Sequence, residues 1–163
     1  MVIALESLFE GGIENIDVDE SFDFSAEEYN GVCPFRSDVR LRGKLTNRAG
    51  IVSIEAVAEF DFSMPCDRCA ADVDRHLLVD VRHVLVQHAE DEDDDLIVVP
   101  DMMLDITSLT LEDIYLSLPM KFLCREDCKG ICPRCGANLN ETSCDCKKEI
   151  DPRLEALLSF MGD

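Results

Sequence analysis

Nine cysteines constrain this 163-residue chain more than any other feature. Six of them lie in one stretch of the sequence, as Cys124, Cys128, Cys132, Cys135, Cys144 and Cys146. Two more form a separate C-x2-C pair, Cys66 and Cys69, and Cys33 is left over. A two-residue spacing brings two sulfurs to one ion, and structural zinc takes four such ligands in a tetrahedron. The cysteines therefore predict metal sites built from thiolates.

The eight clustered cysteines can be grouped in two ways. In the first, four residues within a span of fifteen close a local site: Cys132, Cys135, Cys144 and Cys146. The other four then form a long-range site that joins two distant parts of the chain: Cys66, Cys69, Cys124 and Cys128. In the second grouping, a single site takes its ligands from the six cysteines between Cys124 and Cys146, and Cys66 and Cys69 act as a redox dithiol.

Gly136 follows the local C-x2-C directly, where a left-handed backbone can turn amide groups toward the sulfurs. A site of four thiolates is coordinatively closed, whereas catalytic zinc keeps one position open for water or substrate. We therefore expect zinc, in two structural ions, and no metal catalysis. Loss of the metal is expected to unfold at least residues 121–150.

The stretch 37–87 predicts an antiparallel β-meander. From Val52 to Phe62, apolar residues alternate with mostly polar ones, which is the pattern of a strand with one buried face. Residues 39–45 alternate in the same way, residues 73–86 are rich in β-branched side chains, and residues 47–50 offer a hairpin loop. The first C-x2-C thus falls in a turn between two strands.

Helical patterns follow the meander. Apolar residues recur at helical spacing from Ile106 to Leu118, with Thr107 or Ser108 as N-cap and Pro119 as terminator. A second amphipathic pattern begins at Asp151. Between the meander and the first helix, residues 90–95 are all acidic and predict a solvated loop, and residues 96–99 predict a short strand.

The predicted fold class is α+β, an antiparallel β-meander with one or two amphipathic helices and a C-terminal cysteine-rich zinc module. Three parts are expected along the chain. Residues 1–120 form an acidic β-rich core, residues 121–150 a cysteine-rich zinc module integrated with that core, and residues 151–163 a C-terminal helix.

The net charge of −20 is concentrated outside the cysteine-rich part. Residues 1–120 hold 8 Lys and Arg against 27 Asp and Glu, while residues 121–163 hold 7 against 8. Such a body repels the phosphates of nucleic acids and attracts basic partners, among which ribosomal proteins are abundant. Solubility alone would also account for the acidity.

Several classes of function lack their sequence signals. No Walker A, G-x-S-x-G or G-x-G-x-x-G motif is present, and the three histidines show no ligand spacing. No signal peptide or membrane span is recognisable, so we expect a cytoplasmic protein with no membrane partner, in which close cysteines stay reduced. Cys33 is expected to be a small buried residue.

Three segments together resemble the YceD family, the large ribosomal RNA subunit accumulation proteins of bacteria and plastids. They are residues 65–69 after a strand, the run from Cys124 to Asn140, and residues 151–157. The likeness covers about residues 36–160, and residues 1–35 have no counterpart. In that family the C-x2-C of the meander is the most widespread feature, which favours pairing Cys66 and Cys69 with Cys124 and Cys128.

The resemblance implies a non-enzymatic factor in large-subunit ribosome biogenesis that supports 23S rRNA accumulation. The charge distribution adds a basic large-subunit ribosomal protein or assembly factor as the partner. Two alternatives remain. One is direct binding of ribosomal RNA through the cysteine module, by Arg125, Lys129, Arg134, Lys147 and Lys148. The other is a thiol redox or metal sensor that uses Cys66 and Cys69.

Overall fold

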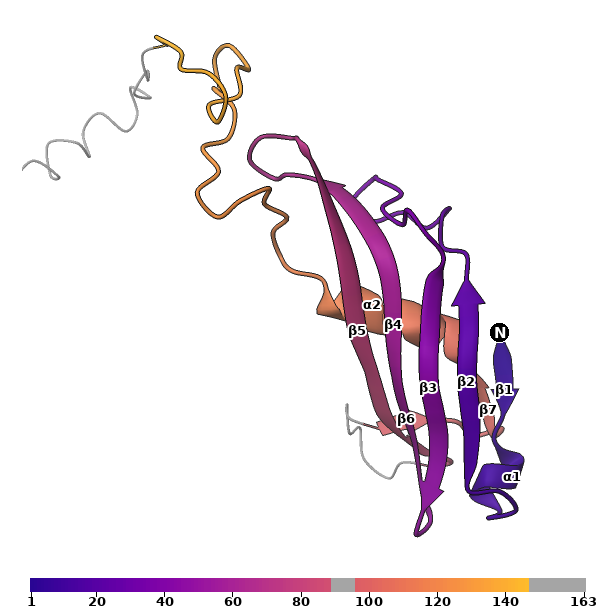
Figure 1. Ribbon diagram of the computed structural model, residues 1–163. Helices are drawn as coiled ribbons and strands as arrows, with labels where there is room; N and C mark the ends of the chain where they lie inside the picture. Colours follow the sequence, from indigo (N-terminus) through magenta and orange to yellow (C-terminus); the bar gives the residue numbers. More distant parts are fainter. Residues whose placement is uncertain (89–95, 147–163) are drawn as a thin grey trace, which may run out of the picture.

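A twisted five-stranded sheet forms most of the molecule in this computed structural model, which describes residues 1–88 and 96–146 (Figure 1). Its strands lie in the order β2-β3-β4-β5-β6. Their bounds are β2 Asn15–Phe22, β3 Val39–Arg48, β4 Ile51–Pro65, β5 Asp72–Val86 and β6 Leu96–Val98. The first four strands are antiparallel to their neighbours, whereas β6 pairs with β5 in parallel at its far end only, from Val84 to Val86.

The remaining elements lie at or behind the sheet. β1 (Val2–Ala4) pairs with β7 (Met103–Asp105) in a separate two-stranded sheet, and α1 is a single turn, Glu6–Phe9. The main helix, α2 (Ile106–Ser117), crosses behind the large sheet (Figure 1). The predicted α+β class with its β-meander over 37–87 is therefore confirmed. The helix expected at 151–163 and the acidic run 90–95 lie outside the described residues.

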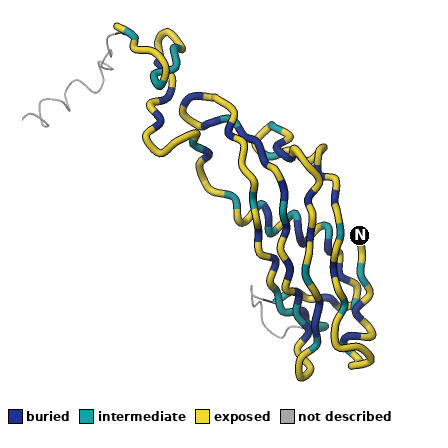
Figure 2. Tube along the Cα trace, in the orientation of Figure 1, coloured by how far each residue is buried: buried dark blue, intermediate teal, exposed yellow. Residues whose placement is uncertain are grey.

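The meander forms where the alternation of apolar and polar residues predicts it. Along β4, apolar residues from Val52 to Met64 are buried at every second position, and Figure 2 shows the same alternation along the neighbouring strands. β3 and β4 are joined by Ala49 and Gly50, both with positive φ, as a tight two-residue hairpin requires. Burial of one face of each strand against α2 and the N-terminal segment supplies the core.

Aromatic side chains extend this core toward the end of the sheet that carries the cysteines. Phe62 contacts Phe35 edge-on and stacks on Phe122, with ring centroids 5.4 and 5.6 Å apart. Tyr29 stacks on Tyr115 of α2 at 5.5 Å. These contacts hold the loop between β2 and β3, and the chain just after α2, against β4.

Two sequence expectations need correction. The N-cap of α2 is Asp105, whose carboxylate accepts the Thr107 and Ser108 amides at 3.2 and 3.4 Å, instead of Thr107 or Ser108. Cys33 is exposed rather than buried, because the adjacent Pro34 and Phe35 take the inward positions. Residues 1–35, for which no individual strand or helix was predicted, contain β1, α1 and the sheet strand β2.

Candidate metal centres

Eight cysteines gather into two groups of four. The sulfurs of one group lie within 4.8 Å of one another, and so do those of the other. The first group contains Cys66, Cys69, Cys124 and Cys128, and the second contains Cys132, Cys135, Cys144 and Cys146. These are the two sets of the two-site interpretation. The single-site alternative, in which Cys66 and Cys69 stand apart as a dithiol, is not the arrangement that the structure shows.

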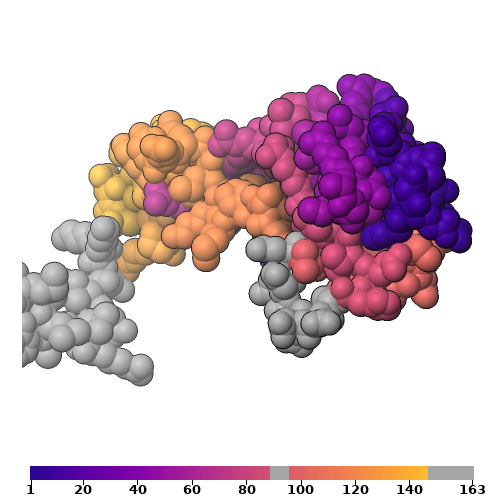
Figure 3. Space-filling view, turned by 90° about the horizontal axis from the view of Figure 1, so that it is seen from below, coloured from indigo at the N-terminus to yellow at the C-terminus, as the bar shows by residue number. Residues whose placement is uncertain are grey.

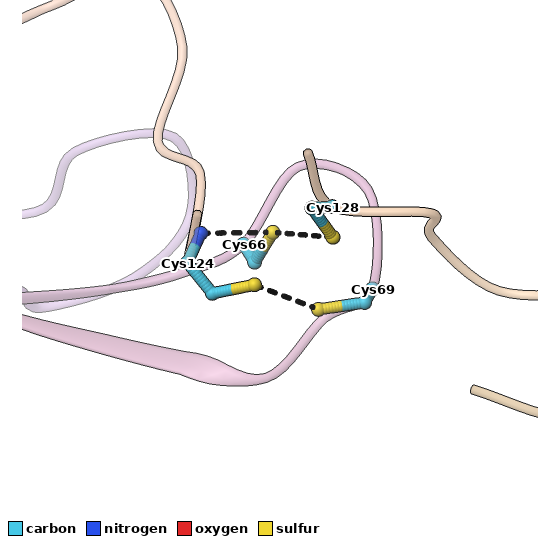
Figure 4. Close-up of side chains that lie close together, drawn as sticks. All are labelled: Cys66, Cys69, Cys124 and Cys128. Carbon is cyan, nitrogen blue, oxygen red and sulfur yellow. Dashed lines mark hydrogen bonds between the residues drawn. The ribbon is translucent and has the colours of Figure 1, made fainter. Parts of the chain in front are cut away.

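The first group, called the long-range site here, joins the sheet to the chain that leaves α2. Cys66 and Cys69 lie in the turn between β4 and β5, and their side chains point toward Cys124 and Cys128 (Figure 4). Three of the four cysteines are buried, and Cys124 is exposed. The prediction that this C-x2-C falls in a strand turn is confirmed.

Sulfur separations in this site fit a shared ion and not disulfides. Cys66 Sγ lies 3.8 Å from Cys128 Sγ, and Cys69 Sγ lies 3.6 Å from Cys124 Sγ. A disulfide needs about 2.0 Å. Four thiolates in a tetrahedron around zinc at about 2.3 Å have their sulfurs about 3.8 Å apart. The four side chains thus have the spacing that a tetrahedral metal ion requires.

Backbone amides prepare Cys66 to be a thiolate. Burial opposes its ionisation, but hydrogen bonds from the N–H groups of Cys124, Arg68 and Cys69 lower the pKa of the thiol to about 6. Burial, together with the neighbouring Cys128 and Cys69 thiols, raises the pKa of Cys124 to about 12. Without a metal the site therefore retains protons on some sulfurs. A bound divalent cation favours loss of these protons.

Polar contacts around the long-range site hold the two chain segments together. Asp67 and Phe122 exchange two hydrogen bonds: the Asp67 amide donates to the Phe122 carbonyl at 2.8 Å, and the Phe122 amide donates to the Asp67 carboxylate at 2.7 Å. The Arg68 guanidinium donates to the carbonyls of Cys128 and Glu126 at 2.8 and 3.3 Å. Asp67 and Arg68, the two residues between Cys66 and Cys69, therefore hold residues 122–128 in place.

Gly130 marks the closest approach of these segments. It has φ of +75°, and a Cβ atom there would lie 2.9 Å from the Arg68 carbonyl oxygen. That carbonyl also accepts the Ile131 amide at 3.0 Å. Any larger side chain would push the segment away from the turn, so the position requires glycine.

The second group, the local site, is a compact knuckle. Cys132 donates its amide to the Ala137 carbonyl at 2.8 Å, and the Gly136 amide donates to the Cys132 carbonyl at 2.9 Å. Gly136 has φ of +71°, the left-handed conformation that the sequence predicts. Amides of Cys135 and Arg134, with the Cys144 thiol, lower the pKa of Cys132 to about 6. Cys132 is buried, Cys144 is half-buried, and Cys135 and Cys146 are exposed.

Asn140 links the two sites. Its side-chain amide donates to Cys128 Sγ at 3.3 Å, while its carbonyl oxygen accepts the Lys129 amide at 2.8 Å. A residue of the local knuckle thus hydrogen-bonds a sulfur of the long-range site. From the sequence, no role was predicted for Asn140, Asp67 or Arg68. Their positions could have indicated these roles, because each is a polar residue inside or just after a C-x2-C pair.

Comparison with known proteins identifies related chains. A family model described as large ribosomal RNA subunit accumulation protein YceD matches residues 54–161. YlbN of Bacillus subtilis is 32% identical over 149 residues, which is 85% of this chain and 87% of that protein. No solved structure matches.

Two other relatives are longer than this chain. Rv2926c of Mycobacterium tuberculosis is 30% identical over 60% of this chain and 49% of its own length. The maize protein named large ribosomal RNA subunit accumulation protein YCED homolog 1, chloroplastic, is 23% identical over 69% of this chain and 50% of its own length. The chain thus spans about half the length of both.

Proposed function

Because the chain belongs to the YceD family of large ribosomal RNA subunit accumulation proteins, we propose that it supports accumulation of large-subunit ribosomal RNA as a cytoplasmic binding protein and not as an enzyme. The family match over residues 54–161 carries this proposal. It includes most of β4, all of β5 and α2, and all eight clustered cysteines, so both candidate metal sites lie inside the matched region. In the described residues, no helix has the length and apolar character to cross a membrane.

Two zinc ions are proposed as the structural cofactors, bound by Cys66, Cys69, Cys124 and Cys128 and by Cys132, Cys135, Cys144 and Cys146. Four sulfurs around each ion leave it no open coordination position, which supports a structural role. Each ion would supply a positive charge that holds the thiolates together. The long-range ion would also fix the segment after α2 to the sheet.

Metal content per chain tests this assignment. Elemental analysis of the purified protein should give two zinc ions in the wild type, and one in Cys69→Ser and in Cys135→Ser. Cys33→Ser is the matched control and should retain both, because Cys33 is exposed and belongs to neither group. Full metal content in Cys69→Ser would return Cys66 and Cys69 to the redox alternative.

A basic protein is the proposed partner. The chain carries 35 Asp and Glu against 15 Lys and Arg, and acidic side chains are exposed on β2, β4 and β5. Long-range attraction between opposite charges speeds association and selects basic proteins over nucleic acids. Large-subunit ribosomal proteins and assembly factors of positive charge are the class that fits both the family and this surface.

Deletion and complementation test the role in the cell. A strain that lacks the gene should show a lower ratio of large-subunit to small-subunit ribosomal RNA, and the wild-type gene should restore it. An unchanged ratio would overturn the proposal. Affinity purification at moderate salt, with the captured proteins identified by mass spectrometry, should recover large-subunit ribosomal proteins or assembly factors of net positive charge.

Direct RNA binding is a second candidate, favoured by one surface feature. A hollow of about 640 Å³ lies between β5 and the chain after α2, where Arg75, Lys121 and Arg125 gather beside apolar side chains that include Leu77 and Phe122. If this hollow holds RNA, Lys121→Ala with Arg125→Ala should weaken binding of a large-subunit rRNA fragment and reduce its salt dependence. Equal binding by wild type and variant would exclude this surface.

A further inference from the structure

Strand β2 leaves one of its edges without a partner. It ends the order of the five-stranded sheet and pairs only with β3, over eight residue pairs from Asn15↔Thr46 to Phe22↔Val39. The other N-terminal strand, β1, belongs to a different sheet. Within the described parts of the chain, no further backbone hydrogen bond reaches residues 15–22. At every second residue, β2 therefore has an N–H and a C=O that point outward.

The N-terminal segment that contains β2 is strongly negative in charge. The first 35 residues contain nine Asp and Glu and no Lys or Arg, and the first cation is Arg36. Residues 1–22 lie together at one end of the molecule, which is coloured indigo in Figure 3. The open edge of the sheet therefore lies in the most uniformly acidic part of the chain.

Three cations of the neighbouring strand β3 face β2, and one of them, Lys44, stands opposite Asp17 in the register without forming an ion pair with it. Arg40 makes a two-fold hydrogen bond to Asp19 at 3.0 and 3.1 Å, and Arg42 lies 3.5 Å from the same carboxylate. Both arginines thus act on one acidic residue. Asp17 and Glu20 have no ion pair or side-chain hydrogen bond with any described residue, and Asp17 is exposed. Their charges remain available to a partner.

We infer that β2 is a docking strand for an extended, Lys- and Arg-rich polypeptide segment, which adds to the sheet as a further strand beyond β2. The choice of a basic partner depends on the proposed function, and the inference adds where and how that partner binds. Main-chain hydrogen bonds along β2 would supply affinity, and the alternate side chains would supply selectivity.

The geometry of a strand explains the selectivity. Side chains on one face of a strand recur about every 6.6 Å, and residues that face each other across two strands have Cβ atoms about 5 Å apart. A partner with basic residues at alternate positions would place them opposite Asp17 and Asp19. Its intervening apolar residues would lie beside Ile16, which is half-buried, and Val18.

A second copy of this chain is a poor occupant of the same edge. Two β2 strands side by side would place acidic residues against each other, and like charges directly opposite in a sheet are destabilising. Charged edge residues also protect natural sheets from unwanted pairing. The acidic side chains thus exclude self-association while they admit a cationic strand.

The opposite side of the sheet provides an internal control. β6 covers β5 only from Val84 to Val86, so no described strand pairs with the outer edge of β5 from Asp72 to His83. That edge carries Arg75, His76 and Arg82 among its acidic residues. A basic strand is therefore expected at β2 and not at β5.

Amide hydrogen exchange measured by NMR on the zinc-loaded full chain tests the inference. The probe is a capped peptide of alternating Lys and Val, and the control is an alternating Lys and Pro peptide of equal charge, which cannot donate from its proline positions. With the Lys–Val peptide at about ten times its Kd, exchange of the outward N–H groups of β2 should slow about tenfold, because only free protein exchanges. The Lys–Pro peptide should leave them unprotected.

A matched pair of variants tests the charge contribution. Asp17→Asn, on the face where the basic residues would lie, should weaken binding of the Lys–Val peptide about 1.4- to 5-fold, from the usual strength of one exposed ion pair. Asp74→Asn, on β5, should leave the affinity unchanged.

Three results would overturn the inference: equal binding of the two peptides, protection at residues 72–83 instead of 15–22, or protection of β2 that grows with protein concentration without peptide. Each leaves the rRNA ratio of the deletion strain unaffected. These results would therefore overturn the docking inference without overturning the proposed function. Only an unchanged rRNA ratio in the deletion strain would overturn the proposed function.

Discussion

Gly43 allows two neighbouring strands of the sheet to approach each other closely. It lies in the middle of β3, opposite Ala56, and a Cβ atom there would lie 2.2 Å from the Glu55 carbonyl oxygen and 2.3 Å from Ala56 Cα. No side-chain rotation can relieve a clash with backbone. The close approach of β3 and β4 at this point therefore depends on glycine.

Gly43→Ala should lower the free energy of unfolding by about 1–3 kcal/mol or more, the range for overpacked interiors. Urea denaturation followed by circular dichroism measures this loss. Gly12→Ala is the control and should change stability by less than about 0.5 kcal/mol, because its nearest neighbour would be the Ser7 carbonyl oxygen at 3.4 Å. Equal effects of the two substitutions would contradict the argument.

His76 gives the outer face of the sheet a pH dependence. Its ring lies 2.8 Å from Asp61 and 3.2 Å from Glu59, and the hydrogen bond to Asp61, followed by the attraction of both carboxylates, raises the pKa of the imidazole. A raised pKa in the folded state means that the stabilisation is complete below the unfolded value near 6.5. It is lost as the pH rises through the folded value.

His76→Gln should therefore reduce stability at pH 6 and have a smaller effect at pH 8. Denaturant unfolding of both proteins across this range measures the difference, and an NMR titration of the His76 ring reports its pKa directly. Added salt should reduce the effect, since the ring is exposed. A difference between the proteins that grows with pH would contradict the prediction.

Cysteine spacing predicted the local group, because its four residues lie within a short stretch of chain. The long-range group was one of two alternatives that spacing left open, and the family resemblance favoured it. Side-chain burial at single positions was harder to predict. Cys33 was wrongly placed in the core, since a loop residue between apolar neighbours can face either way. The predicted N-cap, Thr107 or Ser108, lies two or three residues after the observed one, because α2 begins directly after β7 and is capped by Asp105, the last residue of that strand.

At the scale of elements, the segment after α2 is held to the sheet by apolar packing as well as by cysteines. Phe122 is buried and stacks on Phe62, while its backbone exchanges two hydrogen bonds with Asp67 of the long-range site. Packing at Phe122 thus positions Cys124 before a metal ion binds.

Phe122→Ala should lower the free energy of unfolding by about 3–5 kcal/mol, the usual effect of a buried aromatic side chain. It should also weaken zinc binding at the long-range site more than at the local site, which competition with a metallochromic chelator can resolve into two steps. Met120→Ala is the control, since Met120 is fully exposed. Equal weakening of both zinc steps would contradict the positioning role.

Element prediction succeeded where a strand has one uniformly buried face. β4 meets that condition most fully, whereas β3 and β5 follow the alternation with interruptions, such as the exposed Arg75 in the inward series of β5. β2 was missed because Glu20 stands in the inward-facing series of Ile16, Val18 and Phe22 and breaks the pattern. The parallel pairing of β6 also escaped prediction, because strand order across a sheet depends on tertiary contacts.

At the scale of the whole molecule, the main hydrophobic core and the two cysteine groups are separate. The main core, from Leu5 to Phe122, contains no cysteine. Cys66, Cys69 and Cys128 form a second, small buried cluster with Val73 at the turn between β4 and β5, and residues 132–146 extend beyond that turn (Figure 1). Stability of the sheet and order of the cysteine segment therefore have different sources. The fold class followed from sequence, whereas this spatial separation required the structure.

Removal of the metal should affect these parts unequally. After chelation, amide exchange in residues 124–146 should become rapid, because metal binding supplies much of the folding free energy of small cysteine modules. Amides of β3 and β4 should keep most of their protection. Hydrogen exchange with mass spectrometry, before and after chelation and after zinc is restored, measures both. Simultaneous loss of protection in the sheet would show that the two parts are one cooperative unit.

The long-range site also sets an order of events during synthesis. Cys66 and Cys128 are 62 residues apart, so at roughly 5–20 residues per second the ribosome makes the first about 3–12 s before the second. The strands from β2 to β5 are complete by then. During this interval the nascent chain carries Cys66 and Cys69 without the other two cysteines of their group. The two thiols are then exposed to oxidation or to binding of a competing metal. Each newly made chain therefore depends on a supply of the correct ion at the time when Cys124 and Cys128 are made, if its long-range site is to form.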